Sequence, residues 1–143
     1  MAFREKTAWL ALGVMILAYG GYFIADALAD PEAGPMANVR MLILFGIASV
    51  VRMVLQGGGY LILRARFPQD ARTPPDERDR AIARRGYAFG YGILLAGMIG
   101  IGMIMPFTHS ALQVVNAALA AIVIAEITCG AVAILSYRRG WHG

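Results

Sequence analysis

The chain has 143 residues, of which 59% are hydrophobic and 15% charged, and its formal net charge is +4. This length suits one domain, and apolar stretches of about 20 residues exclude an ordinary soluble domain and indicate membrane spans. The positive charge is not a nucleic-acid footprint, because most basic residues lie where positive charge flanks membrane helices. The single cysteine, Cys129, excludes an internal disulfide, and we expect it to be a small packing residue.

The first predicted span covers residues 8–29, which as a helix crosses a hydrocarbon core of about 30 Å. Small residues at positions 27–29 resemble the cleavage site of a signal peptide. The apolar stretch is longer than a usual signal core, so we expect a retained first helix. The following loop is broken by two prolines, Pro31 and Pro35.

The second predicted span covers residues 39–63 and contains Arg52, with Gln56 one helical turn further along the same face. Arg40 stands at the start of this span, and Asp26 stands one turn before the end of the first span. We expect Asp26 and Arg40 to form an exposed salt bridge at the tip of the hairpin, worth under about 1 kcal/mol.

Residues 64–81 form the predicted linker between the two hairpins, and its second half is typical of a helix start. Thr73 can cap a helix, prolines suit the first turn, and acids favour the positive end of the helix dipole. Asp76 and Arg80 are four residues apart and could pair. This segment is also a candidate for docking a soluble partner, as an alternative to plain capping and anchoring; the candidate residues are Asp76, Glu77, Arg78, Asp79 and Arg80.

The third and fourth predicted spans cover residues 82–105 and 111–137, separated by a short turn in which Ser110 can cap the fourth helix. Helices pack closely in lipid through small residues, and each span has a stripe of them at a spacing of four. The stripes are Ala88, Gly92, Ala96 and Gly100 in the third span, and Ala117, Ala121, Ala125, Cys129 and Ala133 in the fourth. We expect these two stripes to face each other.

The orientation follows from the distribution of Arg and Lys, which concentrate on the cytoplasmic side of membrane proteins. Eleven of the 13 basic residues lie before the first span, in or beside the linker, or after the fourth span. The loop at residues 30–38 carries only acids, and the loop at 106–110 carries no charge. We therefore expect an all-α polytopic protein of four transmembrane helices in two hairpins, forming one domain, with both termini and the linker cytoplasmic. Trp9, Tyr137 and Trp141 fit as interfacial anchors on that side.

Arg52 and Glu126 are the two charged residues deepest in the predicted spans. Each lies 11 residues before the cytoplasmic end of its span, so the two have equal depth and opposite charge. A charge inside a membrane needs a partner or water, so we expect the two side chains to contact each other. The pair is either a structural ion pair or part of a coupling or substrate site, with Gln56 nearby.

No cofactor or metal is expected. His109 belongs to the outer loop and His142 to the cytoplasmic end, so they cannot share a site, and the spans contain no histidine. Phosphate-binding, nucleophile-elbow and zinc-protease motifs are also missing from the sequence.

Two short motifs, FREKTAW at residues 3–9 and DERD at 76–79, resemble motifs of small four-helix bacterial inner-membrane proteins to which no activity is assigned. The resemblance implies a multi-pass protein of the bacterial inner membrane and says nothing about chemistry.

Three hypotheses for function remain open. The first is a non-enzymatic accessory or scaffold protein that binds other membrane subunits or itself within the bilayer. The second is a small proton-coupled exporter that uses Glu126, since small multidrug transporters are similar in length and helix number, although their glutamate lies in the first span. The third is a protein that binds a lipid or a quinone near Arg52, Gln56 and Glu126.

Overall fold

The computed structural model describes residues 3–28 and 35–140, in which the regular elements are all helical. The long helices are α1 (Phe3–Ala27), α2 (Pro35–Arg66), α4 (Glu77–Ile104) and α5 (Ala111–Arg138). A short helix, α3 (Pro68–Arg72), lies in the linker, and a 3₁₀ turn, η1 (Met105–Phe107), ends the third span. Among these described residues, four segments are long and apolar enough to cross a membrane, which confirms the predicted all-α polytopic fold.

Side-chain caps fix the start of two of the long helices. Ser110 accepts from the backbone N–H of Gln113, whose side chain accepts from the Ser110 N–H, so the predicted cap of α5 is confirmed. α4 begins with the same reciprocal arrangement between Asp76 and Asp79. The expectation that Thr73 caps this helix is wrong: Thr73 stands at the C-terminal end of α3, where its hydroxyl donates to the Gln69 carbonyl one turn earlier. The unpredicted α3 ends there, and the chain then runs to Asp76.

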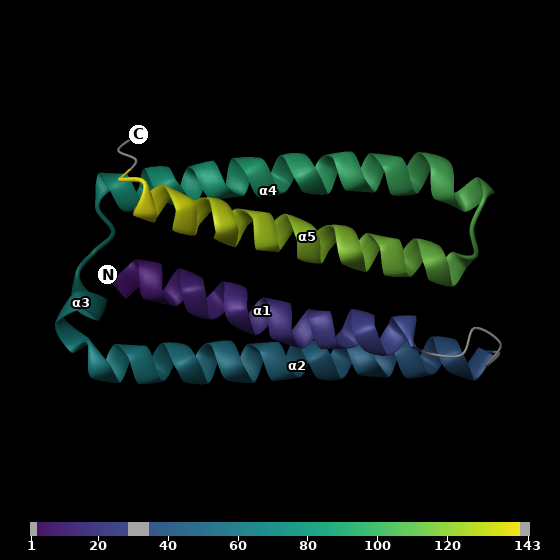
Figure 1. Cartoon of the computed structure of the whole chain (residues 1–143), viewed down its shortest axis with the longest axis horizontal. Helices are drawn as coiled ribbons and strands as arrows, with labels where there is room; N and C mark the ends of the chain where they lie inside the picture. Colours follow the sequence, from purple (N-terminus) through teal and green to yellow (C-terminus); the bar gives the residue numbers. More distant parts are fainter. Residues whose placement is uncertain (1–2, 29–34, 141–143) are drawn as a thin grey trace.

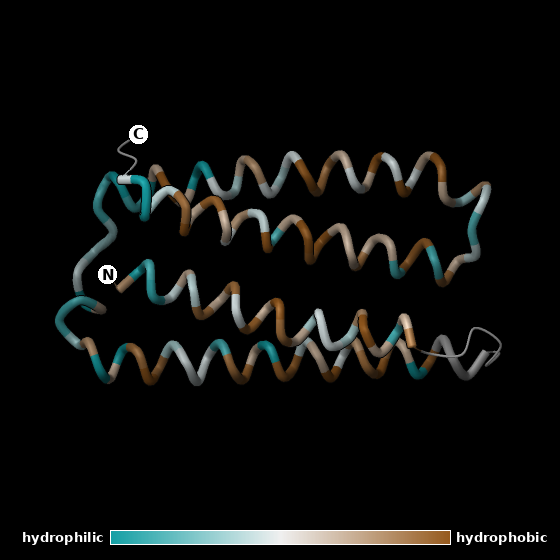
Figure 2. The backbone as a smooth tube through the Cα atoms, in the orientation of Figure 1, coloured by the Kyte–Doolittle hydropathy of each residue, from teal (hydrophilic) through white to brown (hydrophobic). Residues whose placement is uncertain are grey.

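The four long helices lie side by side in the order α4, α5, α1, α2 (Figure 1). α1 packs against α2, α4 packs against α5, and α1 packs against α5, so the first and last spans join the two hairpins. The start of α1, the linker helix α3 and the end of α5 share one end of the molecule, where hydrophilic residues gather (Figures 1 and 2). This arrangement agrees with the predicted pair of hairpins. The assignment of that end to the cytoplasm remains a prediction.

The central position of α1 and α5 is visible in their burial. Met15, Tyr19 and Tyr22 of α1 form a buried cluster with Ala48 of α2 and Val123 of α5. The apolar side chains of α2 and α4 are mostly exposed. These surfaces suit lipid or other membrane helices.

α4 and α5 approach closely, but through a different face of α4 from the predicted one. A β-carbon at Gly86 would lie 2.9 Å from the carbonyl oxygen of Cys129, and one at Gly90 would lie 2.9 Å from that of Ala125. Cys129 is therefore a packing residue, as expected. A β-carbon at Gly92, in contrast, would meet no atom within 4 Å.

The predicted stripe on α5 thus faces α4, whereas the predicted stripe on α4 does not face α5. Ala88 and Gly92 are exposed, and Ala96 and Gly100 border the edge of the interface instead of filling its centre. The reason is that α4 carries two overlapping sets of small residues. The set that includes Gly86 and Gly90 has no side chains at the points where the α5 backbone comes closest, and the predicted set does not lie there.

Candidate functional site

The central pair, Arg52 of α2 and Glu126 of α5, forms a direct salt bridge. The Arg52 Nη2 atom donates to Glu126 Oε2 over 2.7 Å, which confirms the predicted contact. Arg52 lies 13 residues after Val39 and 14 before Arg66, the ends of its span, and Glu126 is similarly central in α5. At 1.5 Å per residue, roughly 20 Å of helix separates the pair from either end. The pair therefore lies near mid-membrane depth.

The central pair is only partly covered by the protein. The side chain of Arg52 is 26% exposed and that of Glu126 is 50% exposed. Arg52 also lies over the ring of Tyr19 on α1, with its guanidinium carbon 5.6 Å from the ring centroid. The arginine thus reaches from α2 across α1 to α5, and it connects both hairpins.

A pocket of about 520 Å³ adjoins Arg52 on the surface of α1 and α2. Its polar lining residues are Tyr19, Ser49, Arg52 and Gln56. The Ser49 hydroxyl lies 3.3 Å from that of Tyr19 and donates to the Phe45 carbonyl. Gln56 is half-buried in this lining, on the expected face of α2, and is not hydrogen-bonded to the central pair within the described residues. Tyr19, instead, supplies the second contact of Arg52.

A second polar group, the Asn116 cluster, joins the hairpins near the opposite end from α3. It consists of Tyr22 and Asp26 on α1, Met41 on α2 and Asn116 on α5. The Tyr22 hydroxyl donates to Asn116 Oδ1 over 2.6 Å, and Asn116 Nδ2 donates to Asp26 Oδ2. Met41 Sδ lies 4.0 Å from the Tyr22 hydroxyl and 3.9 Å from Asn116 Nδ2. The other carboxylate oxygen of Asp26 is buried without a hydrogen-bond partner in the described structure.

The predicted salt bridge between Asp26 and Arg40 is wrong. Asp26 turns toward Asn116, whereas Arg40 is exposed. The neighbouring residue Met41 contacts the cluster, and successive side chains on a helix point about 100° apart. Arg40 is thereby directed away from α1.

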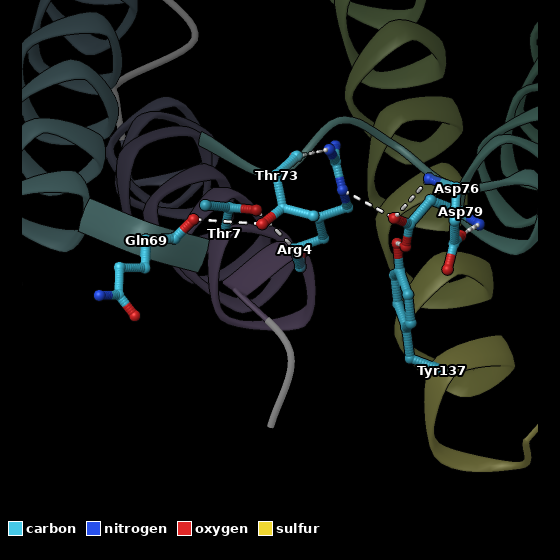
Figure 3. Close-up of polar contacts among 7 residues, drawn as sticks. All are labelled: Arg4, Thr7, Gln69, Thr73, Asp76, Asp79 and Tyr137. Atoms are coloured by element: carbon cyan, nitrogen blue, oxygen red, sulfur yellow. Dashed lines mark hydrogen bonds and ion pairs between the residues drawn. The ribbon is translucent and has the colours of Figure 1, made fainter. Parts of the chain in front are cut away.

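A third polar group, the Arg4 cluster, joins the hairpins at the end that contains α3 (Figure 3). Arg4 Nε on α1 lies 2.8 Å from Asp79 Oδ2 on α4, and the Tyr137 hydroxyl on α5 donates to Asp79 Oδ1 over 2.8 Å. Arg4 also donates to the Thr73 carbonyl in the linker. The Asp79 carboxylate therefore binds Arg4 of α1 and Tyr137 of α5 while it also caps α4.

The predicted docking segment, residues 76–80, is largely occupied by these internal contacts. Asp76 and Asp79 cap α4, and Arg78 donates to the Tyr137 carbonyl. Glu77 and Arg80 are exposed. The expected pair of Asp76 with Arg80 is absent from the described salt bridges, because the Asp76 carboxylate is engaged in capping. Only part of the segment remains open to a partner.

Four contact residues were not predicted from the sequence: Tyr19, Tyr22, Asn116 and Arg4. The spacing of Tyr19, Tyr22 and Asp26 places them on one face of α1, and this pattern could have predicted a polar contact surface. Asn116 is a polar residue inside a predicted span, which could also have indicated a contact with another helix. The partner of Arg4 lies 75 positions away at Asp79, and no local pattern indicates it.

The remaining predictions concern the interfacial aromatic residues, the histidines and the break in the first loop. Trp9 is exposed on α1 and Tyr137 belongs to the Arg4 cluster. Trp141, His142 and the break at Pro31 lie outside the described residues. His109 contacts the neighbouring Thr108 hydroxyl in the turn before α5.

Within the described residues, four helices long and apolar enough to cross a membrane, joined by polar contacts between them, indicate a multi-pass membrane protein. Comparisons with protein-family models, with curated proteins and with solved structures found no match.

Proposed function

We propose that this protein is a non-enzymatic accessory or scaffold subunit of the bacterial inner membrane. In this proposal, another membrane protein or a second copy of the chain covers the face that carries the central pair. The Arg distribution and the FREKTAW and DERD motifs support this location.

The exposed half of the Glu126 side chain carries the proposal. A charge at the centre of the bilayer costs about 2.5–3.5 kcal/mol on insertion scales, and charged side chains in spans face a partner, the protein interior or water. Arg52 satisfies one side of the Glu126 carboxylate, and 50% of the side chain is still exposed. A neighbouring helix with a polar or small side chain would remove the remaining contact with lipid.

Cysteine cross-linking in native membranes tests this assembly. Met53, which lines the pocket beside Arg52 and is 68% exposed, is replaced by cysteine in a Cys129→Ala background. We expect Met53→Cys to give a cross-linked species heavier than the 15.4 kDa chain. The matched control is Leu17→Cys, which is 73% exposed and lies about 200° around α1 from Tyr19. Equal cross-linking at both sites, or none at either, would contradict the proposal.

The proposed orientation has its own test. Reporters fused after Gly34, Thr73 and Gly143 should report an external, a cytoplasmic and a cytoplasmic position, respectively, because basic flanks stay inside. An external signal at Thr73 would reverse the topology.

The pocket beside Arg52 supports a second candidate, binding of a lipid or a quinone. Its volume of about 520 Å³ and its hydroxyl, amide and guanidinium donors suit a carbonyl group held within the bilayer. Titration with a quinone, in the wild type and in Gln56→Leu, tests this candidate. We expect weaker binding to the variant if the pocket is used.

A proton-coupled exporter has less support from the geometry. Such an exporter would need the Glu126 carboxylate to exchange Arg52 for a proton or a cationic substrate during its cycle. The 2.7 Å contact places a competing cation on that carboxylate.

A further inference from the structure

The central pair is not fully enclosed by its own chain. The four long helices lie in a row, so the molecule has two broad faces, with α2 and α4 at its opposite edges (Figure 1). The pair joins α2 to α5, and both of its side chains reach the surface, that of Glu126 to a greater extent than that of Arg52. Among the described residues, the hydrogen bond of Glu126 uses Oε2, and its Oε1 atom has none. A carboxylate accepts through both oxygens, so Glu126 has room for a second donor from outside the chain.

The depth of Glu126 restricts what this donor can be. Lipid chains offer no hydrogen bonds, and cations or polar groups at mid-membrane depth are rare because each of them is costly. A partner of unrelated sequence would have to match charge, depth and position independently. A second copy of this chain meets the first two conditions at once, because it carries Arg52 at the depth of Glu126.

Symmetry supplies the third condition, the matching position. Copies with the same orientation in the membrane are related by rotation about an axis along the membrane normal, and this rotation preserves depth. A two-fold axis between two facing copies also exchanges the two sides of the face. The Arg52 side of one central pair then lies opposite the Glu126 side of the other. A guanidinium has five N–H donors, so each arginine can bind the carboxylates of both copies.

The surface around the central pair suits the close approach of another copy. Met53, next to Arg52, and Ile122, one turn before Glu126, are exposed apolar side chains. Once a second copy covers them, they would exclude water from the charges and so strengthen the attraction. A β-carbon at Gly57, which lines the pocket beside Arg52, would meet no atom within 4 Å, so a partner side chain has space there.

A groove between α4 and α5 offers a contrast on the surface of the same hairpin. It has a volume of about 450 Å³, and its lining residues are glycines and apolar residues, among them Ile93, Gly100 and Ile124. Lipid chains suit such a surface, so the groove does not require a protein partner. The exposed carboxylate of Glu126 does require one, or water.

We propose that the partner on the face of the central pair is a second copy of the chain, in a two-fold dimer in which Glu126 of each copy contacts Arg52 of the other. This inference rests on the proposed assembly and names its partner. The dimer joins two ion pairs into one network of four side chains at mid-membrane depth.

Exchange of the two charges tests the reciprocal contact. The variant Arg52→Glu with Glu126→Arg keeps an ion pair within each chain, and it restores both contacts when it meets a copy of itself. A mixed dimer with the wild type places like charges opposite each other at both contacts. Two differently tagged forms are co-expressed and purified through one tag in mild detergent. We expect each form to recover itself and mixed recovery to fall by about tenfold or more, because like charges across an interface suppress association.

The other outcomes separate this inference from the proposed function. Mixed recovery equal to that of the wild type with itself would show that the charges do not meet across an interface and would overturn the dimer. Failure of wild-type copies to recover each other would overturn it as well. If Met53→Cys is then cross-linked to a different protein in native membranes, the accessory function stands and the choice of partner is wrong. Absence of any cross-link would contradict both.

A matched pair of variants that keeps both charges guards against misfolding of the exchanged chain. Ile122→Trp adds bulk one turn from Glu126, whereas Ile124→Trp adds the same bulk in the groove beside α4, about 200° around α5. The two isoleucines are similarly exposed. We expect Ile122→Trp to lower self-recovery severalfold and Ile124→Trp to leave it near that of the wild type. Equal recovery of the two variants would contradict the place assigned to the interface.

Discussion

The interface within the α4–α5 hairpin and the interface between the two hairpins are built on different physical terms. α4 meets α5 through glycines that let backbone contact backbone. The two hairpins meet through polar contacts at three levels: the Asn116 cluster, the central pair and the Arg4 cluster. Lipid supplies no hydrophobic drive between helices, so association depends on close packing or on polar contacts. Close packing at glycines distinguishes the first interface, whereas polar contacts supplement the buried apolar cluster at the second, so the two should respond differently to mutation.

The largest effect should come from adding atoms to the steric interface. In Gly90→Leu the new β-carbon would lie 2.9 Å from the Ala125 carbonyl oxygen, so one helix must shift. We expect a loss of about 3 kcal/mol or more, from overpacking against backbone that cannot adapt like a side chain. Thermal unfolding in detergent measures it.

The matched control for this change is Gly92→Leu, which makes the same gain in helix propensity on the same helix. Its new side chain meets open space, so stability should stay within about 0.5 kcal/mol of the wild type or rise. Similar losses in both variants would show that the glycine contacts do not define the interface.

The next largest effect concerns the central pair, where the response should be non-additive. Arg52→Leu or Glu126→Leu should each cost about 2–3 kcal/mol, because either change leaves the opposite charge alone at mid-membrane depth. The double variant should recover part of this loss. Unfolding of the four proteins in one detergent gives the coupling energy. Strictly additive losses would mean that the two residues do not stabilise each other.

A smaller effect is expected in the Asn116 cluster. Asn116→Leu removes both hydrogen bonds of the amide and should cost about 1–2 kcal/mol, because Asp26 then loses its donor. Tyr22→Phe removes only the hydroxyl and should cost about 0.5–1 kcal/mol. The same unfolding assay ranks them. A larger loss for Tyr22→Phe would indicate that the ring packing of Tyr22 changes too.

The smallest effect is expected at the Arg4 cluster. The side chains of Arg4 and Asp79 are 35% and 18% exposed, so solvent screens their attraction. Arg4→Gln should therefore cost under about 1 kcal/mol, and the difference from wild type should shrink in high salt. A loss that is independent of salt would indicate that Arg4 acts through its hydrogen bond to the linker carbonyl.

Depth in the membrane could be predicted from the sequence, because it requires only counting along a helix. The four spans and the contact between Arg52 and Glu126 both follow from such counting. Charges inside apolar spans are rare enough that two at the same depth have few alternatives to pairing.

Rotation about the helix axis could not be predicted in the same way. α4 has small residues on more than one face, and nothing local distinguishes the face at Gly90 from the face at Gly92. The partner of Asp26 also depends on helix rotation, which the sequence does not give. Arg40 is the nearest opposite charge along the hairpin, but the rotation of α2 presents Met41 instead, and Asn116 arrives from a distant helix.

The join between α1 and α5 has a consequence for biosynthesis. α5 is translated after α1, α2 and α4, yet it supplies the partners of Arg52 and of the α1 carboxylate at Asp26. Until Ala111–Arg138 has entered the bilayer, Arg52 lies at mid-membrane depth without Glu126, and Asp26, near the end of α1, lacks Asn116. Because an unpaired charge at that depth is costly, we expect Arg52 to be hydrated or held within the insertion machinery until the last span packs against α1.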